Sequence, residues 1–194
     1  MRNYKAAFSL LNVILILMIF ASVTTCHAKN NEKKGKRSGK MTMTLKCDDI
    51  SNGERIPDKF TCEGADVSPK LTWEGIPESA RELVLIMDDP DAPMGTWTHW
   101  IVYGISPERK TLPENVEKSA EVKSLGIRQG ITSFRKPGYG GPCPPPGPTH
   151  HYYFKLYALK TSSGLSAGAS LKDVEKVIKV KTISKTQLMG TYSR

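Results

Sequence analysis

The chain of 194 residues is long enough for one domain of ordinary size with a real core, and too short for two domains of that size. Hydrophobic residues make up 39% and charged residues 24% of it, a balance typical of a globular protein rather than a disordered one. The formal net charge of +9 is concentrated near the N-terminus, where residues 29–40 carry six basic side chains and one acidic one. The remainder is nearly neutral, so the sequence predicts no specific binding of nucleic acid.

Residues 1–28 have the pattern of a targeting segment. A short basic region precedes an apolar run over residues 6–20, and Cys26 and Ala28 fill the small-residue positions of a cleavage site. We therefore expect a cleaved signal peptide and an exported protein, periplasmic or extracellular. Two alternatives stay open. The apolar stretch reaches the minimum length of a membrane anchor, and the residues before Cys26 loosely resemble a lipoprotein cleavage box, which would give a lipid anchor.

Residues 29–42 are expected to form a basic flexible linker that is able to contact a membrane surface. After it, residues 43–194 are expected to fold as a single, mostly β domain. Short apolar or alternating runs are separated there by Gly, Pro, Asp and Asn, as in antiparallel β proteins. Five such runs predict strands over residues 42–46, 70–73, 82–87, 97–105 and 150–159.

Two helices are expected late in the chain. Ser170 is a suitable N-cap, and the apolar residues from Leu171 to Ile178 fall on one face at helical spacing. A second, short helix is expected over residues 184–189, with Gly190 ending it. The predicted class is therefore mostly β with helices near the C-terminus.

An acidic turn follows the third expected strand. Residues 88–93 read Asp-Asp-Pro-Asp-Ala-Pro, and the two prolines hold the carboxylates in a stiff turn at a sheet edge. By itself this pattern is that of a well-built turn. In the next strand, a period of two predicts that Trp97, His99, Ile101 and Tyr103 share one face. A histidine on such a face is more often a core residue than a ligand-binding one.

A loop rich in glycine and proline precedes the last expected strand. Residues 138–147 read Gly-Tyr-Gly-Gly-Pro-Cys-Pro-Pro-Pro-Gly, in which glycines allow close backbone approach and prolines stiffen the chain. In the strand that follows, His150 and Tyr152 share a face, and His151 lies on the other. A stiff loop beside a His-x-Tyr face indicates the wall of a small polar pocket. The alternative is a proline-rich segment that binds an SH3-like partner.

Three of these motifs, in this order, resemble the signature of the phosphatidylethanolamine-binding protein (PEBP) family. They are Asp-Pro-Asp-Ala-Pro at residues 89–93, His99 on the following strand, and the Gly-Pro loop with His-x-Tyr over residues 138–152. Residues 60–73 are similar to the bacterial and archaeal branch, often described as Raf-kinase-inhibitor-like. The resemblance extends over residues 43–194. It implies an antiparallel β-sandwich with Greek-key strands, small C-terminal helices and one ligand pocket near a sheet edge.

The resemblance also implies which residues form the pocket. Carried over by position, they are Asp89, Pro93, His99, Gly141, His150 and Tyr152, with Tyr192 closing the pocket. Imidazole N–H groups, amides of the glycine loop and the tyrosine hydroxyl suit a phosphate-like or carboxylate ligand. Asp89 would then fix the tautomer of a neighbouring histidine. One departure from the family pattern is His151, which stands where an arginine is usual.

Three functions stay open. We expect a non-enzymatic binding protein for a phosphate-like or phospholipid-headgroup anion, without a cofactor, since the common hydrolase and phosphate-gripping motifs are absent from the sequence. The alternatives are an inhibitor of a protease or kinase that acts through the pocket rim, and a metal-dependent enzyme built on two histidines and one carboxylate. The expected partners are a small anionic or phosphorylated ligand, a kinase or protease, or a second copy of the chain.

Three cysteines fall in the expected domain, and their odd number suggests one disulfide and one free thiol in an oxidising compartment. No Cys-x-x-Cys pair is present, so a zinc ribbon is not expected. Cys62 and Cys143 lie in the stretches that most resemble the family. The resemblance therefore favours a bridge between them, which leaves Cys47 free or paired with another chain.

Overall fold

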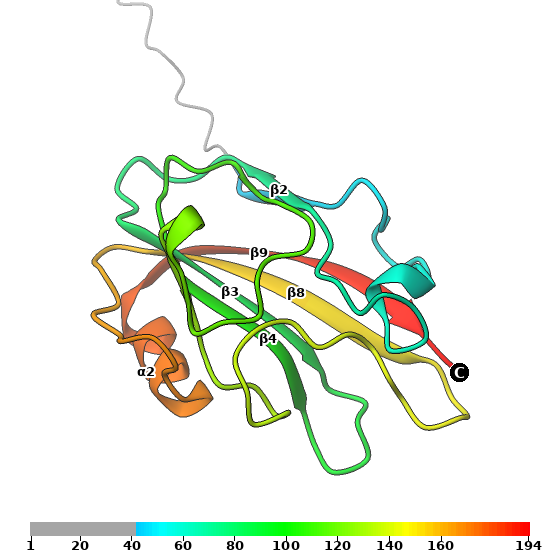
Figure 1. Ribbon diagram of the computed structural model, residues 1–194. Coiled ribbons are helices and arrows are strands. Elements are labelled where there is room, and N and C mark those ends of the chain that lie inside the picture. The colour runs from blue at the N-terminus through cyan, green and yellow to red at the C-terminus, as the bar shows by residue number, and fades with distance from the viewer. Residues whose placement is uncertain (1–41) are drawn as a thin grey trace, which may run out of the picture. The chain divides into compact units, whose positions relative to one another are not determined.

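The computed structural model describes residues 42–194, and these residues form two antiparallel sheets (Figure 1). The smaller sheet contains, in spatial order, β1 (Thr44–Lys46), β2 (Leu71–Glu74) and β5 (Thr111–Leu112). The larger sheet contains, in spatial order, β6 (Glu121–Val122), β7 (Ile127–Gln129), β4 (Trp97–Ile105), β3 (Glu82–Asp89), β8 (His150–Leu159) and β9 (Thr182–Tyr192). The described helices are α2 (Leu171–Lys181) and the short 3₁₀ helices η1 (Asp58–Phe60) and η2 (Lys123–Leu125).

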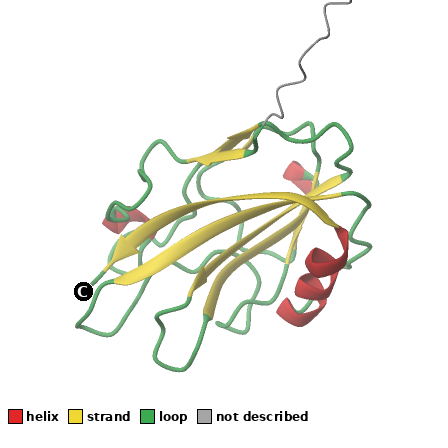
Figure 2. Ribbon diagram, turned by 180° about the vertical axis from the view of Figure 1, so that it is seen from behind, coloured by secondary structure: helices red, strands yellow, loops and turns green. Residues whose placement is uncertain are grey.

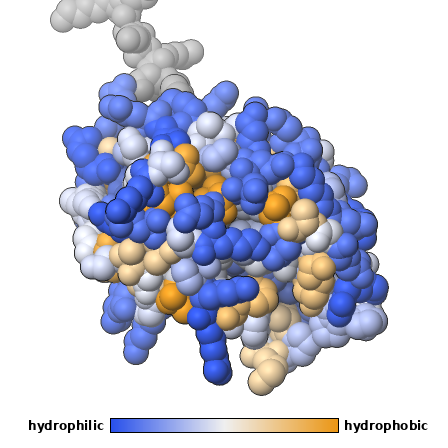
Figure 3. All heavy atoms as spheres, viewed as in Figure 1, coloured by the Kyte–Doolittle hydropathy of each residue, from blue (hydrophilic) through white to orange (hydrophobic). Residues whose placement is uncertain are grey.

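The expected targeting segment at residues 1–28 lies outside the described residues, as does the linker up to residue 41. Among the helices that the structure describes, none is long and apolar enough to cross a membrane. Figure 3 shows a face on which hydrophilic residues predominate and apolar residues form small patches. In the described part of the chain, the exposed large apolar side chains are Met94, Val180 and Ile183.

The central strand β3 is buried along its whole length, and it separates two hydrophobic cores. Leu83, Leu85 and Met87 face the core that also contains residues of the smaller sheet. Val84 and Ile86 face the second core, which lies beneath α2. Full burial of one such aliphatic side chain stabilises a fold by about 1.5–3 kcal/mol, so covering both faces holds β3 firmly between its neighbours. Figure 2 shows β3, β4, β8 and β9 side by side, with α2 beside them.

All five runs predicted as strands are strands in the structure, and the runs 97–105 and 150–159 coincide with β4 and β8. The first expected helix is confirmed as well. Ser170 is its N-cap, because its hydroxyl accepts a hydrogen bond from the backbone N–H of Asp173 at 3.3 Å. The predicted mostly β class with two antiparallel sheets is therefore confirmed.

The second predicted helix, over residues 184–189, is wrong. These residues belong to β9, which pairs with β8 from Thr182 opposite Leu159 to Tyr192 opposite His150. Pairing over this length outweighs the weak local preference for a helix. Gly190 lies within β9 and does not end a helix. Glycine is needed at this position because a Cβ would lie 2.6 Å from the Ile56 side chain.

The predicted common face of β4 is also wrong, because β4 contains a β-bulge. Met87 pairs with Trp100 and Asp88 pairs with Thr98, so the register shifts at His99. One extra residue in a strand moves all later side chains to the opposite face. Trp97 and His99 consequently line one cavity, whereas Ile101 and Tyr103 pack in the core beneath α2.

Candidate functional site

A cavity of about 220 Å³ lies where the C-terminal end of β3 meets the N-terminal ends of β4 and β8. Its polar side chains come from these three strands and are Asp89, His99, His150 and Tyr152. Its apolar walls come from the turn after β3, from β4 and from two loops, and consist of Ala92, Pro93, Trp97, Phe134, Pro144 and Pro145. The bulge in β4 is what turns His99 toward this cavity. The site is thus a small chamber with one polar end and apolar sides.

Asp89 and His150 form a buried pair at the polar end. The Asp89 Oδ2 atom lies 2.8 Å from His150 Nδ1, and each side chain is 5% exposed. The other carboxylate oxygen of Asp89 accepts a hydrogen bond from the backbone N–H of Asp91 at 2.8 Å. An ionised Asp89 accepts at both oxygens, so Nδ1 of His150 carries the hydrogen. In the neutral imidazole, Nε2 of His150 is then a lone-pair acceptor.

His99 is held in the same tautomer by the backbone. Its Nδ1 atom lies 2.7 Å from the carbonyl oxygen of Gly140. A carbonyl oxygen only accepts hydrogen bonds, so Nδ1 of His99 is the donor and Nε2 carries the lone pair. Burial lowers the pKa of His99, although its hydrogen bond to Gly140 acts in the opposite direction. The imidazole of His99 is therefore neutral at neutral pH.

Tyr152 lies between the two histidines. Its ring meets the His99 ring edge-on, with centroids 5.2 Å apart, and stacks on the His150 ring at 6.5 Å. The Tyr152 hydroxyl is buried and makes no hydrogen bond with any other described residue. Burial also raises the pKa of Tyr152, so the hydroxyl stays protonated at neutral pH. The nearby Asp89 carboxylate raises this pKa further, but no hydrogen bond of normal geometry joins it to the hydroxyl, which is therefore a buried donor that is not engaged within residues 42–194.

The structure places Gly141 outside the cavity lining, contrary to the expectation that this loop supplies amides to a ligand. The backbone N–H of Gly141 donates to Asp66 Oδ1 at 2.6 Å, and that of Gly140 donates to the carbonyl oxygen of His99 at 3.0 Å. A Cβ at Gly141 would lie 2.3 Å from the carbonyl oxygen of Phe60. Glycine is needed here because the backbones approach closely, and both amides are used inside the protein.

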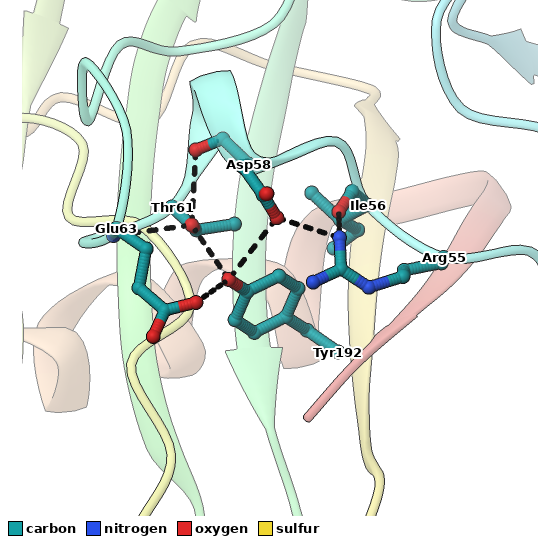
Figure 4. A network of polar contacts seen from close by, with 6 residues as sticks. All are labelled: Arg55, Ile56, Asp58, Thr61, Glu63 and Tyr192. Atoms are coloured by element: carbon teal, nitrogen blue, oxygen red, sulfur yellow. Dashed lines mark hydrogen bonds and ion pairs between the residues drawn. The ribbon is translucent and has the colours of Figure 1, made fainter. Parts of the chain in front are cut away.

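Tyr192, which was expected to close the cavity, is not among the residues that line it. Its hydroxyl donates to Glu63 Oε2 at 2.5 Å and lies 3.2 Å from Asp58 Oδ1 and from the Thr61 hydroxyl (Figure 4). The guanidinium of Arg55 lies over its ring, 4.4 Å from the centroid. The tyrosine therefore ties the end of β9 to the segment around η1.

His151 lies on the outer face of β8, as the alternation predicts. Its Nδ1 atom is 2.7 Å from Asp91 Oδ2, and these two side chains are 44% and 41% exposed. Hydrogen bonding to His151 lowers the pKa of Asp91. The chain thus carries two Asp–His pairs next to each other, one buried in the cavity and one at the surface.

A disulfide joins the loop at the cavity to the segment that follows η1. It links Cys62 and Cys143, whose Cα atoms are 5.4 Å apart. The backbone N–H of Cys62 also donates to the carbonyl oxygen of Pro142 at 3.1 Å. Because Cys143 itself lines the cavity, the disulfide fixes one of its walls. Cys47 is buried and is the free thiol among the described cysteines.

Several lining residues, among them Phe134, Pro144 and Pro145, were not predicted from the sequence as part of the site. Phe134 packs edge-on against Trp97 and His99, with centroids 5.4 Å away in both cases. It is a single aromatic residue in a loop, which gives no pattern to detect. Pro144 and Pro145 belong to the stiff loop that the sequence did single out, although not as lining residues. Within residues 42–194, no three His, Cys, Asp or Glu side chains are grouped as a metal ion would require.

The fold and the cavity define a class: small proteins of two antiparallel sheets with one polar chamber at the strand ends. Comparison with known families agrees, since the family model named phosphatidylethanolamine-binding protein matches residues 46–193. The chain belongs to this family. The prediction that the three sequence motifs carry the PEBP signature, in its bacterial and archaeal branch, is confirmed.

Similar proteins are found in both bacteria and archaea. A UPF0098 protein from Aquifex aeolicus is 50% identical over 147 residues, which are 75% of this chain and 85% of that protein. One from Pyrococcus horikoshii is 47% identical over 159 residues, which are 80% of each chain.

Two solved structures share the fold. The PEBP homologue CT736 of Chlamydia trachomatis superposes with a TM-score of 0.72 at 34% identity, over 79% of this chain and 99% of that one. YbcL of Escherichia coli, a member of the mammalian PEBP family, superposes with a TM-score of 0.73 at 32% identity, over 78% and 98%.

Proposed function

We propose that this protein binds a small oxyanion, such as phosphate or a phosphorylated headgroup, in the cavity and carries out no reaction on it. The observation behind the proposal is the Tyr152 hydroxyl, a buried donor that makes no hydrogen bond of normal geometry among the described residues. Leaving such a group unpaired destabilises a protein by about 1–3 kcal/mol. A ligand oxygen would supply the acceptor, and the imidazoles of His99 and His150 line the cavity beside it.

The dimensions and walls of the cavity support a ligand with a polar head. A chamber of about 220 Å³ accepts a phosphate-sized group, and Trp97, Phe134 and Pro144 offer apolar contact to a substituent on it. The name of the family, phosphatidylethanolamine-binding, refers to a ligand of this kind.

The state of the candidate nucleophiles in the cavity supports binding rather than catalysis. The sulfur of Cys143 is engaged in a disulfide. Burial raises the pKa of Tyr152 and keeps its hydroxyl protonated, so this oxygen is a weak nucleophile. The His150–Asp89 pair could serve as a base, but the hydrogen bond of His150 Nδ1 goes to Asp89 and to neither Cys143 nor Tyr152.

A second function, docking of a protein partner such as a protease or kinase at the rim, is supported by Met94. This side chain is 96% exposed and lies in the turn whose Pro93 lines the cavity. We also propose an exported protein, because a disulfide persists in oxidising compartments.

Calorimetric titration of the protein with phosphate tests the main proposal. We expect saturable binding of one phosphate per chain, and we expect acetate, a smaller oxyanion, to compete for the same site. If neither phosphate nor acetate binds at millimolar concentration, the proposal is contradicted.

A further inference from the structure

The hydrogen atoms at the polar end of the cavity can be assigned from their fixed partners. Nδ1 of His99 donates to the carbonyl oxygen of Gly140, and Nδ1 of His150 donates to the carboxylate of Asp89. In the neutral imidazoles, each Nε2 atom is therefore an acceptor and not a donor. The two nitrogens on which a bound anion would depend have no hydrogen to offer it.

The Asp89 carboxylate adds a negative charge to a cavity in which both imidazoles already present acceptors to an anion that needs donors. Both of its oxygens already accept hydrogen bonds, from the backbone N–H of Asp91 and from Nδ1 of His150, so its negative charge is fixed beside the cavity. The polar end of the cavity thus offers an anion one hydrogen-bond donor, the Tyr152 hydroxyl. Beside it lie two acceptor nitrogens, Nε2 of His99 and of His150, and the Asp89 carboxylate. An oxyanion without hydrogen would be bound by the first of these groups and repelled by the others.

A single added proton removes the mismatch. On Nε2 of His150 it creates a donor aimed at the ligand, and the Asp89 carboxylate, 2.8 Å from Nδ1, offsets the positive charge. His99 is less suited to receive the proton, because its Nδ1 faces an uncharged carbonyl group. Burial also lowers the pKa of His99 and keeps it neutral.

We propose that the cavity binds its oxyanion together with one proton, held between the ligand oxygen and Nε2 of His150. The inference rests on the proposed binding function and specifies the ligand class: an oxyanion that is protonated in the complex. A ligand such as hydrogen phosphate brings the hydrogen itself and donates it to Nε2. An oxyanion without hydrogen, such as sulfate or a phosphodiester, requires a proton from solvent, which forms the N–H bond on Nε2.

Other titratable groups close to His150 must be separated from it in any pH experiment. They come from β3, β4, β8, β9 and the turn after β3, and are Asp89, His99, Tyr152, Tyr192 and Asp91. Burial raises the pKa of both tyrosines, which keeps them protonated in the neutral range. Hydrogen bonding to His151 lowers the pKa of Asp91, which keeps this carboxyl ionised. Among the histidines that the structure describes, His151 lies outside the cavity and serves as the control.

The test is calorimetric titration of the whole protein with sulfate, which carries no hydrogen between pH 5.5 and 8. Each titration is repeated in two buffers with different enthalpies of ionisation, so that proton uptake appears as a difference in heat. We expect uptake of up to one proton, and an affinity that rises by up to about tenfold for each unit of pH decrease. His150→Gln should abolish the uptake, whereas His151→Gln should retain it.

The possible results separate the inference from the function on which it rests. Sulfate binding with the same heat in both buffers and the same affinity at all pH values would overturn the proton coupling and leave the binding function intact. If neither sulfate nor phosphate binds at any pH, both are overturned. Binding of methylammonium that tightens as the pH rises would show that the acceptor-rich cavity takes a cation, which contradicts both.

Discussion

His150 Nδ1 and Asp89 Oδ2 lie 2.8 Å apart inside the protein, and the next histidine along the strand, His151, forms the same kind of pair with Asp91 at the surface. The buried pair has side chains that are 5% exposed, against 44% and 41% for the surface pair. The two pairs have equal chemistry and different burial. Each therefore serves as the control for the other.

We predict that Asp89→Asn lowers the free energy of unfolding by about 1–3 kcal/mol, because it removes a charged acceptor from a buried hydrogen bond. Asp91→Asn should change it by less than about 1 kcal/mol, since exposed ion pairs contribute little. Urea denaturation of both variants at neutral pH provides the comparison. An equal loss in the two variants would mean that the Asp89–His150 pair is not buried as described.

The same contrast applies to ligand affinity. His150→Ala should weaken phosphate binding by at least about 1–3 kcal/mol, the loss expected for a buried hydrogen-bond partner. His151→Ala should leave the affinity nearly unchanged, because His151 lies on the outer face of β8. Calorimetry with phosphate measures both. Equal losses would show that the two histidines do not occupy opposite faces.

The disulfide should contribute strongly to stability. Cys62 and Cys143 are separated by 81 positions, and in the chain-entropy model closing a loop of this length stabilises the fold by up to about 4 kcal/mol. Addition of a dithiol reductant should lower the midpoint of urea denaturation accordingly. The control is Cys47→Ala, which should keep the response to reductant since Cys47 is outside the disulfide. If the reductant leaves the midpoint of urea denaturation unchanged, the pairing of Cys62 with Cys143 is contradicted.

The neutral, buried state of His99 predicts a dependence of stability on pH. Because burial lowers the pKa of His99, the unfolded chain binds a proton below about pH 6.5 that the folded protein does not. The free energy of unfolding should therefore fall as the pH drops from about 6.5 toward the lowered pKa, by at most about 1.4 kcal/mol per pH unit. His99→Gln should flatten this part of the curve. Urea denaturation between pH 8 and pH 5 measures the slope, and an unchanged slope in His99→Gln would refute the assignment to His99.

The predictions from sequence succeeded where side-chain alternation continues without interruption. In β8 the buried His150, Tyr152 and Phe154 alternate with less buried neighbours, so both the strand and its faces could be predicted. The bulge in β4 could not be predicted, because His99 to Tyr103 are all buried and an inserted residue leaves no trace in such a run. In β9, the pairing with β8 decides the structure, and a local pattern does not contain that information.

The candidate site shows a related limit. The family motifs marked Asp89, Pro93, His99, His150 and Tyr152, which do line one cavity. They equally marked Gly141 and Tyr192, whose backbone N–H and hydroxyl bond to Asp66 and Glu63 and which are not among the lining residues. Motif residues can hold a wall in place as well as face a ligand, and only the geometry distinguishes the two roles.

The most direct measurement of the central claim compares Tyr152→Phe with Tyr153→Phe. The Tyr152 hydroxyl makes no hydrogen bond within the described residues, so its removal should not lower the free energy of unfolding. It should nevertheless weaken phosphate binding by about tenfold or more, the loss expected when a donor to a charged ligand is removed. Tyr153→Phe, on the outer face of the same strand, should bind phosphate like the unmodified protein. If Tyr152→Phe binds phosphate as tightly as the unmodified protein does, the cavity is not the oxyanion site.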